Sequence, residues 1–132
     1  MKQLNKYIVE RLHINKDTGN HHYNYHPKTS DELKELVDKL IKERGNDADL
    51  NDIDTSEITD MYGMFKDSNF NGDISEWDVS NVKDMEGLFY SSKFNGDISN
   101  WDVRNVKYMN DIFKYSPLQL KRNQSKRCKI IS

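Results

Sequence analysis

Apolar side chains recur at helical spacing in two segments near the start of the chain. In residues 30–44 they fall at i, i+3, i+4, i+7 and i+8, and Thr29 followed by Glu32 fits a capping box. Gly45 follows as a stop signal. A shorter apolar stripe covers residues 2–12. The pattern therefore predicts helices over about 2–12 and 30–44, each of which must pack against an apolar partner.

From residue 53 onward the pattern repeats every 24 residues. Ile53, Trp77 and Trp101 stand at this spacing. Two further sets keep it, the methionines Met61, Met85 and Met109 and the phenylalanines Phe65, Phe89 and Phe113. The segment FNGDIS occurs twice unchanged, at 70–75 and 94–99. Residues 53–116 are therefore a tandem repeat with two full units and a partial third.

Each unit contains spacings typical of a short strand and a short helix. Ile74, Trp77 and Val79 reproduce the LxxLxL spacing of a strand whose alternate side chains point inward. Residues 82–89 continue at about helical spacing. Asn-Gly pairs at 71–72 and 95–96 predict turns, because both residue types tolerate positive φ. A 24-residue period lies in the range of leucine-rich repeats.

These elements predict an α+β repeat solenoid, a short leucine-rich-repeat-like stack capped by N-terminal helices. The expected division is an N-terminal helical cap region over 1–52, the solenoid over 53–116 and a basic C-terminal tail over 117–132. Repeat arrays need capped ends, and the last unit lacks its FNGDIS portion. We therefore expect either self-association through the C-terminal coil or a cover formed by the chain itself. The candidate covering residues are Leu118, Leu120, Ile130 and Ile131.

The repeat FNGDISxWDVSNVxxMxxLF resembles that of BspA-type leucine-rich repeat proteins of bacteria. The resemblance implies a solenoid used for adhesion or binding, and it implies no catalytic residues. The family is usually found at the surface or secreted, whereas this chain shows no signal or lipid-attachment sequence. The opening LNKYIVERL followed by such repeats also resembles small proteins of phages or mobile elements of low-GC hosts.

Composition and charge refine this picture. The chain is 35% hydrophobic and 32% charged but contains 14 aromatic residues, which indicates a thin core anchored by aromatic rings. Residues 52–116 carry 13 acidic and 6 basic side chains, whereas 117–132 carry five basic and no acidic ones. The basic residues of the tail are Lys121, Arg122, Lys126, Arg127 and Lys129. They predict at most weak, salt-sensitive contact with nucleic acid or an acidic membrane, and otherwise a tail that is solvated or lies on the acidic stack.

Compartment signals are few. No secretory signal is apparent in residues 1–12, and no run of about 20 apolar residues predicts a membrane span. Cys128 has no second cysteine with which to form a disulfide. The expected location is therefore cytoplasmic, in the host cell if the gene is carried by a phage.

Candidate chemistry is sparse. His21, His22 and His26 match no ordinary metal-site spacing, so a metal-dependent enzyme built on this loop is a minor alternative. Recurrent aspartates suggest either a calcium ladder or, beside Ser, Thr and Asn, the capping of turns, which we favour. They are Asp54, Asp73, Asp78, Asp97 and Asp102. No catalytic motif is found, which predicts a protein without enzymatic activity, metal or cofactor.

The candidate contact residues come from three sets: polar positions that vary between units, tyrosines that break the period, and carboxylates of the acidic surface. They are Glu57, Asp73, Glu76, Asp78, Ser80, Asp84, Tyr90, Asn100, Arg104 and Tyr108. The leading hypothesis is a non-enzymatic protein–protein interaction module that presents an acidic repeat surface. The alternative is an inhibitor encoded by a phage or mobile element, whose acidic surface occupies a basic, nucleic-acid-binding surface of a host enzyme.

Overall fold

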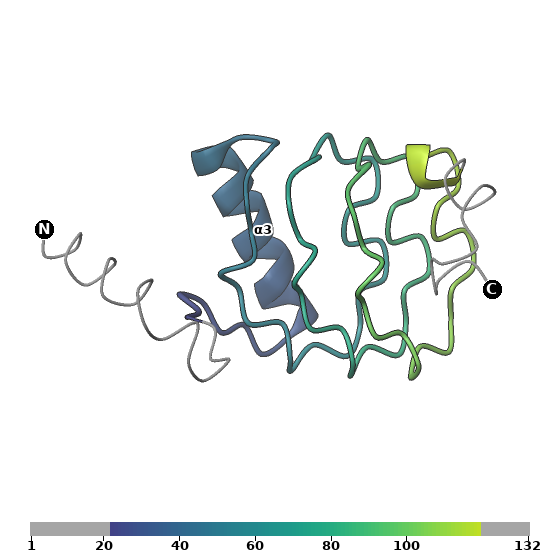
Figure 1. The fold of residues 1–132 in the computed structure, drawn as a ribbon, viewed down its shortest axis with the longest axis horizontal. Helices are drawn as coiled ribbons and strands as arrows, with labels where there is room; N and C mark the ends of the chain where they lie inside the picture. The colour runs from purple at the N-terminus through teal and green to yellow at the C-terminus, as the bar shows by residue number, and fades with distance from the viewer. Residues whose placement is uncertain (1–21, 120–132) are drawn as a thin grey trace, which may run out of the picture.

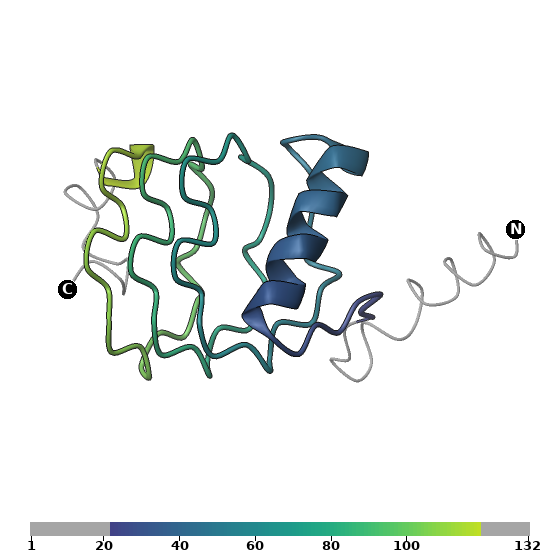
Figure 2. The ribbon, with the colours of Figure 1, turned by 180° about the vertical axis from the view of Figure 1, so that it is seen from behind.

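The computed structural model describes residues 22–119 of the 132-residue chain. A helix lies at one end, and irregular coils of the chain follow it side by side (Figure 1, Figure 2). The coils are residues 46–69, 70–93 and 94–117. Backbone hydrogen bonds join them, such as Met61 N to Asp84 O and Met85 N to Tyr108 O, both at 2.8 Å. The sequence period is therefore the length of one coil.

The helix α3 (Ser30–Arg44) begins and ends where the sequence predicts it. Thr29 Oγ1 accepts from the backbone N–H of Glu32 at 3.1 Å, and Glu32 Oε1 accepts from Lys28 N at 2.7 Å. The glutamate thus reaches one residue further back than the cap itself. Gly45 closes the helix by donating its N–H to Ile41 O at 2.7 Å. The fully buried side chains of the helix are Leu33, Val37 and Leu40.

The predicted α+β repeat solenoid is wrong, because residues 22–119 contain no β-strand and no sheet. Within residues 22–119, β-type pairing between successive segments is confined to isolated parallel bridges. These are Tyr25–Ile53, Asp49–Asp73, Asp60–Asp84 and Asp84–Tyr108. Helical structure in this part of the chain is confined to α3 and a helical turn that begins at Pro117.

Tight turns replace both elements predicted within each unit. Trp77 N donates to Ile74 O at 3.2 Å, so the chain turns where the LxxLxL spacing predicts an extended strand. Leu88 N donates to Met85 O at 3.1 Å, a three-residue turn in place of helical i→i−4 bonding. Gly87 then has a φ of 62°, which no right-handed helix contains.

The positive-φ positions also differ from the prediction. Neither Gly72 nor Gly96 has a positive φ. Within the coils, the positive-φ positions fall instead in two columns of residues 24 apart in the sequence. One column is Gly63, Gly87 and Asp111, and the other is Asp67, Ser91 and Tyr115. At Gly72 the missing side chain permits close approach, since a Cβ there would lie 1.9 Å from Ala48 O.

Aromatic rings fill the core from coil to coil. Phe65, Phe89 and Phe113 stack in a column with centroid separations of 5.7 and 6.1 Å. Phe70 and Phe94 form a second column, with centroids 6.0 Å apart. The tryptophans Trp77 and Trp101 are 3% and 1% exposed, which confirms their predicted place in the core. Ring stacking explains how a chain so rich in charge keeps a buried centre.

Each tryptophan also fixes its coil to the preceding one. Trp77 Nε1 donates to Leu50 O at 2.9 Å, and Trp101 Nε1 donates to Ile74 O at 3.1 Å. Asparagines do the same at the surface: Asn81 Nδ2 donates to Ser56 O and Asn105 Nδ2 to Ser80 O, both at 2.7 Å. These repeated side chains add to the backbone hydrogen bonds that join the coils.

The described body is larger than the predicted repeat at its start. Asn71 N donates to Asn46 O and Asp73 N to Ala48 O, so the first coil begins at residue 46 rather than 53. In the last coil Trp101 and Phe113 are buried, as is Leu118. Self-association through that coil stays a prediction. The predicted helix over 2–12 and the tail residues from 120 onward lie outside the described residues. Within residues 22–119, no helix is long and apolar enough to cross a bilayer.

Candidate binding surface

Aspartates hold the turns of every coil. The Oδ1 atom of each accepts the backbone N–H two residues later, for example Ser75 N to Asp73 at 2.9 Å and Ser80 N to Asp78 at 3.0 Å. The five predicted turn-capping aspartates all make this bond, which confirms their structural role. Asp49, Asp60 and Asp84 do so as well.

These turns leave carboxylates along one part of each coil, which we call the acidic side (residues 49–57, 73–81 and 97–105). It carries nine acidic side chains and one basic one, Arg104. Some are paired: Glu57 lies 2.8 Å from Lys28 Nζ, and Asp52 lies 3.0 Å from Arg44. Burial raises the pKa of Tyr23 nearby, and so do Asp54 and other carboxylates of this side. The acidic side therefore carries a net negative potential.

Hydrogen bonds keep several of these carboxyls ionised. The backbone N–H of Ser75, together with side-chain bonds from Asn51 and Ser75, holds the pKa of Asp73 below its usual value. Burial opposes ionisation of Asp52 and Asp54. The pKa of both is nevertheless lowered, by hydrogen bonds from Arg44 and Asn24 to Asp52 and from Ser56 and His26 to Asp54.

Acidification is expected to destabilise the fold through these groups. Their pKa values are lower in the folded than in the unfolded chain, so their contribution is complete above the unfolded pKa of about 3.9 and is lost as the pH falls through the folded values. Melting temperatures between pH 7 and pH 2.5 should therefore fall below about pH 4. Asp73→Asn should show a weaker fall than the parent chain. A melting temperature independent of pH in this window would contradict the assignment.

A second part of each coil gathers exposed aromatic rings; we call it the tyrosine side (residues 60–67, 84–91 and 108–115). Within residues 22–119, the large hydrophobic side chains that are exposed all belong to it: Tyr62 at 62%, Tyr108 at 54% and Tyr115 at 66%. Tyr90 packs edge-on against Tyr115 with ring centroids 5.4 Å apart. Lys66 Nζ lies 5.4 Å from the Tyr90 centroid. Lys114 Nζ lies at the same distance, 5.4 Å, from the Tyr115 centroid, so each of these two rings has a cation over it.

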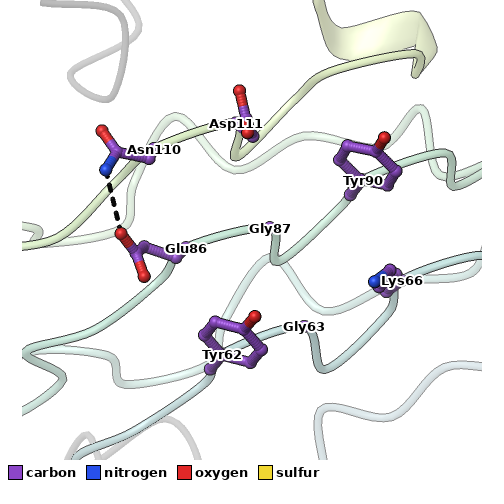
Figure 3. Close-up of a pocket in the computed structure, with 8 residues that line it drawn as sticks. All are labelled: Tyr62, Gly63, Lys66, Glu86, Gly87, Tyr90, Asn110 and Asp111. Atoms are coloured by element: carbon purple, nitrogen blue, oxygen red, sulfur yellow. Dashed lines mark hydrogen bonds between the residues drawn. The ribbon is translucent and has the colours of Figure 1, made fainter.

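A depression of about 420 Å³ lies within the tyrosine side. Its lining residues are Tyr62, Gly63, Lys66, Glu86, Gly87, Tyr90, Asn110 and Asp111. Figure 3 shows the two glycines between the rings of Tyr62 and Tyr90. Across the next coil boundary Asn110 Nδ2 donates to Glu86 Oε2 at 2.9 Å. The hollow therefore arises because two left-handed turns carry no side chain, while aromatic and charged side chains surround them.

Asp111 occupies the third left-handed turn of this column, where the preceding coils have glycine. Its φ is 57°, against 58° at Gly63 and 62° at Gly87. A side chain in this conformation costs free energy, and such strain often marks positions kept for function. The carboxylate therefore stands in the depression at a position that glycine would occupy with less strain.

Asp111→Gly is expected to raise the free energy of unfolding by about 0.5–1 kcal/mol, since it relieves the left-handed conformation. Asp111→Ala is the matched control and should lower it, because alanine tolerates this φ less well than aspartate. Urea denaturation of the three proteins measures both effects. A less stable glycine variant would show instead that the carboxylate itself stabilises the coil.

The ten predicted contact residues fall on both sides. Glu57, Asp73, Glu76, Asp78, Ser80, Asn100 and Arg104 lie on the acidic side. Asp84, Tyr90 and Tyr108 lie on the tyrosine side, and of these Tyr90 lines the depression. Arg104 is engaged with Asp102 at 2.9 Å, and Ser80 Oγ donates to Asp78 at 2.6 Å.

Sequence reasoning missed most of the depression. Lys66, Glu86, Asn110 and Asp111 were not among the predicted contacts, although each varies between units, whereas Tyr62 breaks the period and is a candidate on that ground. The useful signal is the pair of glycines 24 residues apart, Gly63 and Gly87, which marks a column without side chains.

The histidine-rich loop is only partly described. His26 Nδ1 lies 3.3 Å from Asp54 Oδ2, and His22 Nε2 lies 3.1 Å from Asn24 Oδ1. His21 lies outside the described residues. Over residues 22–119, no group of three or more His, Cys, Asp or Glu side chains is placed to hold a metal ion.

The geometry defines a small protein of stacked coils that carries an acidic side and a tyrosine-lined depression on its surface. The chain belongs to the family described as "Mycoplasma protein of unknown function, DUF285", whose family model matches residues 32–126. Searches of the curated proteins and of the solved structures returned no match. The resemblance to BspA-type leucine-rich repeat proteins stays a prediction.

Proposed function

We propose that this protein is a non-enzymatic binding module that recognises another protein through its tyrosine side. The supporting observation is that every exposed large hydrophobic side chain in residues 22–119 is a tyrosine of this one surface. Tyrosine offers a large contact area at low conformational cost and is enriched at protein interfaces. The depression beside Tyr62 and Tyr90 adds a concave centre into which a partner side chain can fit.

Charge complements this surface. The tyrosine side carries five acidic and two basic side chains, and the acidic side carries nine against one. Both therefore favour a partner with a basic contact surface, which long-range attraction would bring to the protein quickly. The two lysines of the tyrosine side, Lys66 and Lys114, lie over tyrosine rings. The carboxylates of this side, such as Asp111 and Glu86, are therefore the charged groups best placed to meet partner cations.

The test is capture of partners from a native host, followed by binding measurements with the purified candidate. The triple variant Tyr62→Ser, Tyr108→Ser, Tyr115→Ser should lose at least about tenfold in affinity, as expected for aromatic anchors. It should keep its melting temperature, since exposed substitutions change stability little. Asn100→Ala, an exposed change on the acidic side, is the control and should bind as the parent does. Equal binding by the triple variant would reject the tyrosine side as the interface.

The acidic side supports a second candidate, in which the protein occupies a basic, nucleic-acid-binding surface of an enzyme. Glu76 is exposed there, and the aspartate column Asp49, Asp73 and Asp97 is exposed with it. Binding of this kind would weaken steeply with salt. Glu76→Gln should then reduce affinity, while the tyrosine triple variant should not. The two variants together therefore distinguish the two functions.

A further inference from the structure

The coils are joined along the tyrosine side by a regular row of backbone hydrogen bonds. Alternate residues of the first coil donate to the second, from Met61 N to Asp84 O through Asp67 N to Tyr90 O, at 2.8–2.9 Å. Residues 85, 87, 89 and 91 of the second coil donate in the same way to 108, 110, 112 and 114 of the third, at 2.8–3.0 Å. Each coil thus presents its donors toward the coil that follows.

The third coil has the equivalent row of N–H donors, but these donors lack the backbone acceptors that the second and third coils supply to the first and second. The equivalent N–H groups belong to Met109, Asp111, Phe113 and Tyr115. Tyr115 N donates to Gln119 Oε1 at 3.2 Å, in the helical turn after the coil. For Met109, Asp111 and Phe113, no acceptor is found between residues 22 and 119. The row of donors therefore continues to the last coil and stops at an edge of three N–H groups.

The opposite end of the stack is closed. The first coil presents backbone carbonyls toward α3, where Ser30 Oγ donates to Asp60 O and Lys34 Nζ donates to Met64 O at 3.1 Å. Side chains of the helix thus take the place that backbone donors of a preceding coil would hold. Along this row the stack is consequently polar, with carbonyls directed toward α3 and N–H groups presented at the other end, whereas Lys83 N and Lys107 N beside the row donate to the preceding coil.

We propose that the edge Met109–Phe113 binds an extended segment of a partner protein, which adds its backbone to the stack as a further coil would. This inference rests on the proposed binding function and specifies how the partner is held. Carbonyl oxygens of alternate residues of the segment accept from Met109, Asp111 and Phe113, the mode in which peptides extend exposed backbone edges. Tyr108 and Asp111 lie on this edge and contact the segment's side chains, and the excess of carboxylates on the tyrosine side favours a neutral or basic segment.

A second copy of the chain fits this edge poorly. Two copies meeting end to end through this row of their last coils would place the N–H groups of Met109, Asp111 and Phe113 against the same donors of the other copy. Head-to-tail stacking would need the carbonyls of the first coil, two of which, Asp60 O and Met64 O, already accept from side chains of α3. The geometry therefore favours a different protein that supplies free carbonyl groups in an extended conformation.

Amide hydrogen exchange of the full chain, followed by NMR, tests the free edge. The amides of Met85, Gly87 and Phe89, each 24 residues earlier, are internal controls. Met85 and Phe89 have the same residue type as their counterparts Met109 and Phe113. The amides of Met109, Asp111 and Phe113 should exchange at least about tenfold faster than these controls. Equal protection in dilute protein would show that this chain already fills the edge and would overturn the proposal. Protection that appears only as the protein concentration rises would assign the edge to self-association, which also overturns it.

A synthetic peptide copying residues 104–116 tests binding, because carbonyls of this sequence accept from the second coil in the stack. Added in excess, it should slow exchange of the three edge amides about tenfold, whereas a peptide of scrambled order should not. Binding of the peptide without that protection would overturn the proposal. A native partner that requires Tyr62, Tyr108 and Tyr115 but leaves the edge amides fast would likewise overturn it, while leaving the proposed function intact. A partner that protects the edge amides but binds the tyrosine triple variant as well as the parent would support the edge and reject the tyrosine side as the interface.

Discussion

Phe89→Ala is expected to lower the free energy of unfolding by about 3–5 kcal/mol, the range for removal of a buried aromatic ring. Phe89 is fully buried in the middle coil. Its ring centroid lies 5.7 Å from Phe65, 4.7 Å from Phe94 and 6.1 Å from both Trp101 and Phe113. The cavity left by alanine would open at the junction of both phenylalanine columns. Since small domains have a total stability of about 5–15 kcal/mol, this variant should be partly unfolded at 37 °C.

Phe113→Ala is the matched control for this prediction. Phe113 has the same side chain in the same column and is 4% exposed, but it lies in the last coil and stacks on Phe89 alone among the described rings. Its loss should cost clearly less, and urea denaturation of both variants measures the difference. Equal costs would mean that the two columns do not act as one core and that each coil is stabilised independently.

The helix and the core could be predicted because their signals are local or repeated. Thr29, Glu32 and Gly45 are sequence-specific start and stop signals, and they bound α3 as expected. Residues that recur every 24 positions lie beside one another in successive coils, so a repeated apolar residue is placed in the core whatever path the coil takes. This is why the tryptophans and phenylalanines were assigned correctly without knowledge of the backbone.

The class of structure could not be predicted by the same means. An apolar spacing of three residues is produced by a strand of the LxxLxL kind, by a helix, or by a tight turn such as that from Ile74 to Trp77. The backbone of one coil changes direction too often to form either a β-strand or an α-helix. Tryptophan N–H groups and asparagine amides add to the backbone hydrogen bonds between coils, and these side-chain bonds leave no mark in hydropathy.

The start of the first coil was missed for a related reason. Ala48 and Leu50 stand where the later coils have Gly72 and Ile74, and Asn46 stands where they have phenylalanine. The sequence therefore departs from the repeat at the positions used to recognise it. The backbone still places Leu50 where the next coil has Ile74, since Leu50 O accepts from Trp77 Nε1 at 2.9 Å as Ile74 O accepts from Trp101 Nε1 at 3.1 Å.

Gly72→Ala is expected to lower the free energy of unfolding by about 3 kcal/mol or more, because its Cβ would collide with backbone. The added atom would lie 1.9 Å from Ala48 O and 2.6 Å from the Phe70 ring. Ala48 O also accepts from Asp73 N at 2.9 Å, so the carbonyl cannot move away without breaking that bond. Relief requires the first and second coils to separate, and this loosens the junction that carries Trp77.

Gly63→Ala and Gly96→Ala are the controls that separate collision from backbone strain. At Gly63 a Cβ would meet nothing nearer than Lys66 Cβ at 3.8 Å, so only its φ of 58° opposes alanine, at about 1–2 kcal/mol. At Gly96 the nearest atoms belong to the Phe94 ring at 2.6 Å, while the Gly72 carbonyl oxygen is 3.3 Å away. Because a ring can shift more easily than a bonded carbonyl, Gly96→Ala should cost less than Gly72→Ala. Urea denaturation of the three variants should therefore show the largest loss in free energy of unfolding for Gly72→Ala. A larger loss for Gly63→Ala would mean that the left-handed turns, rather than the close contact between coils, limit the stability of this fold.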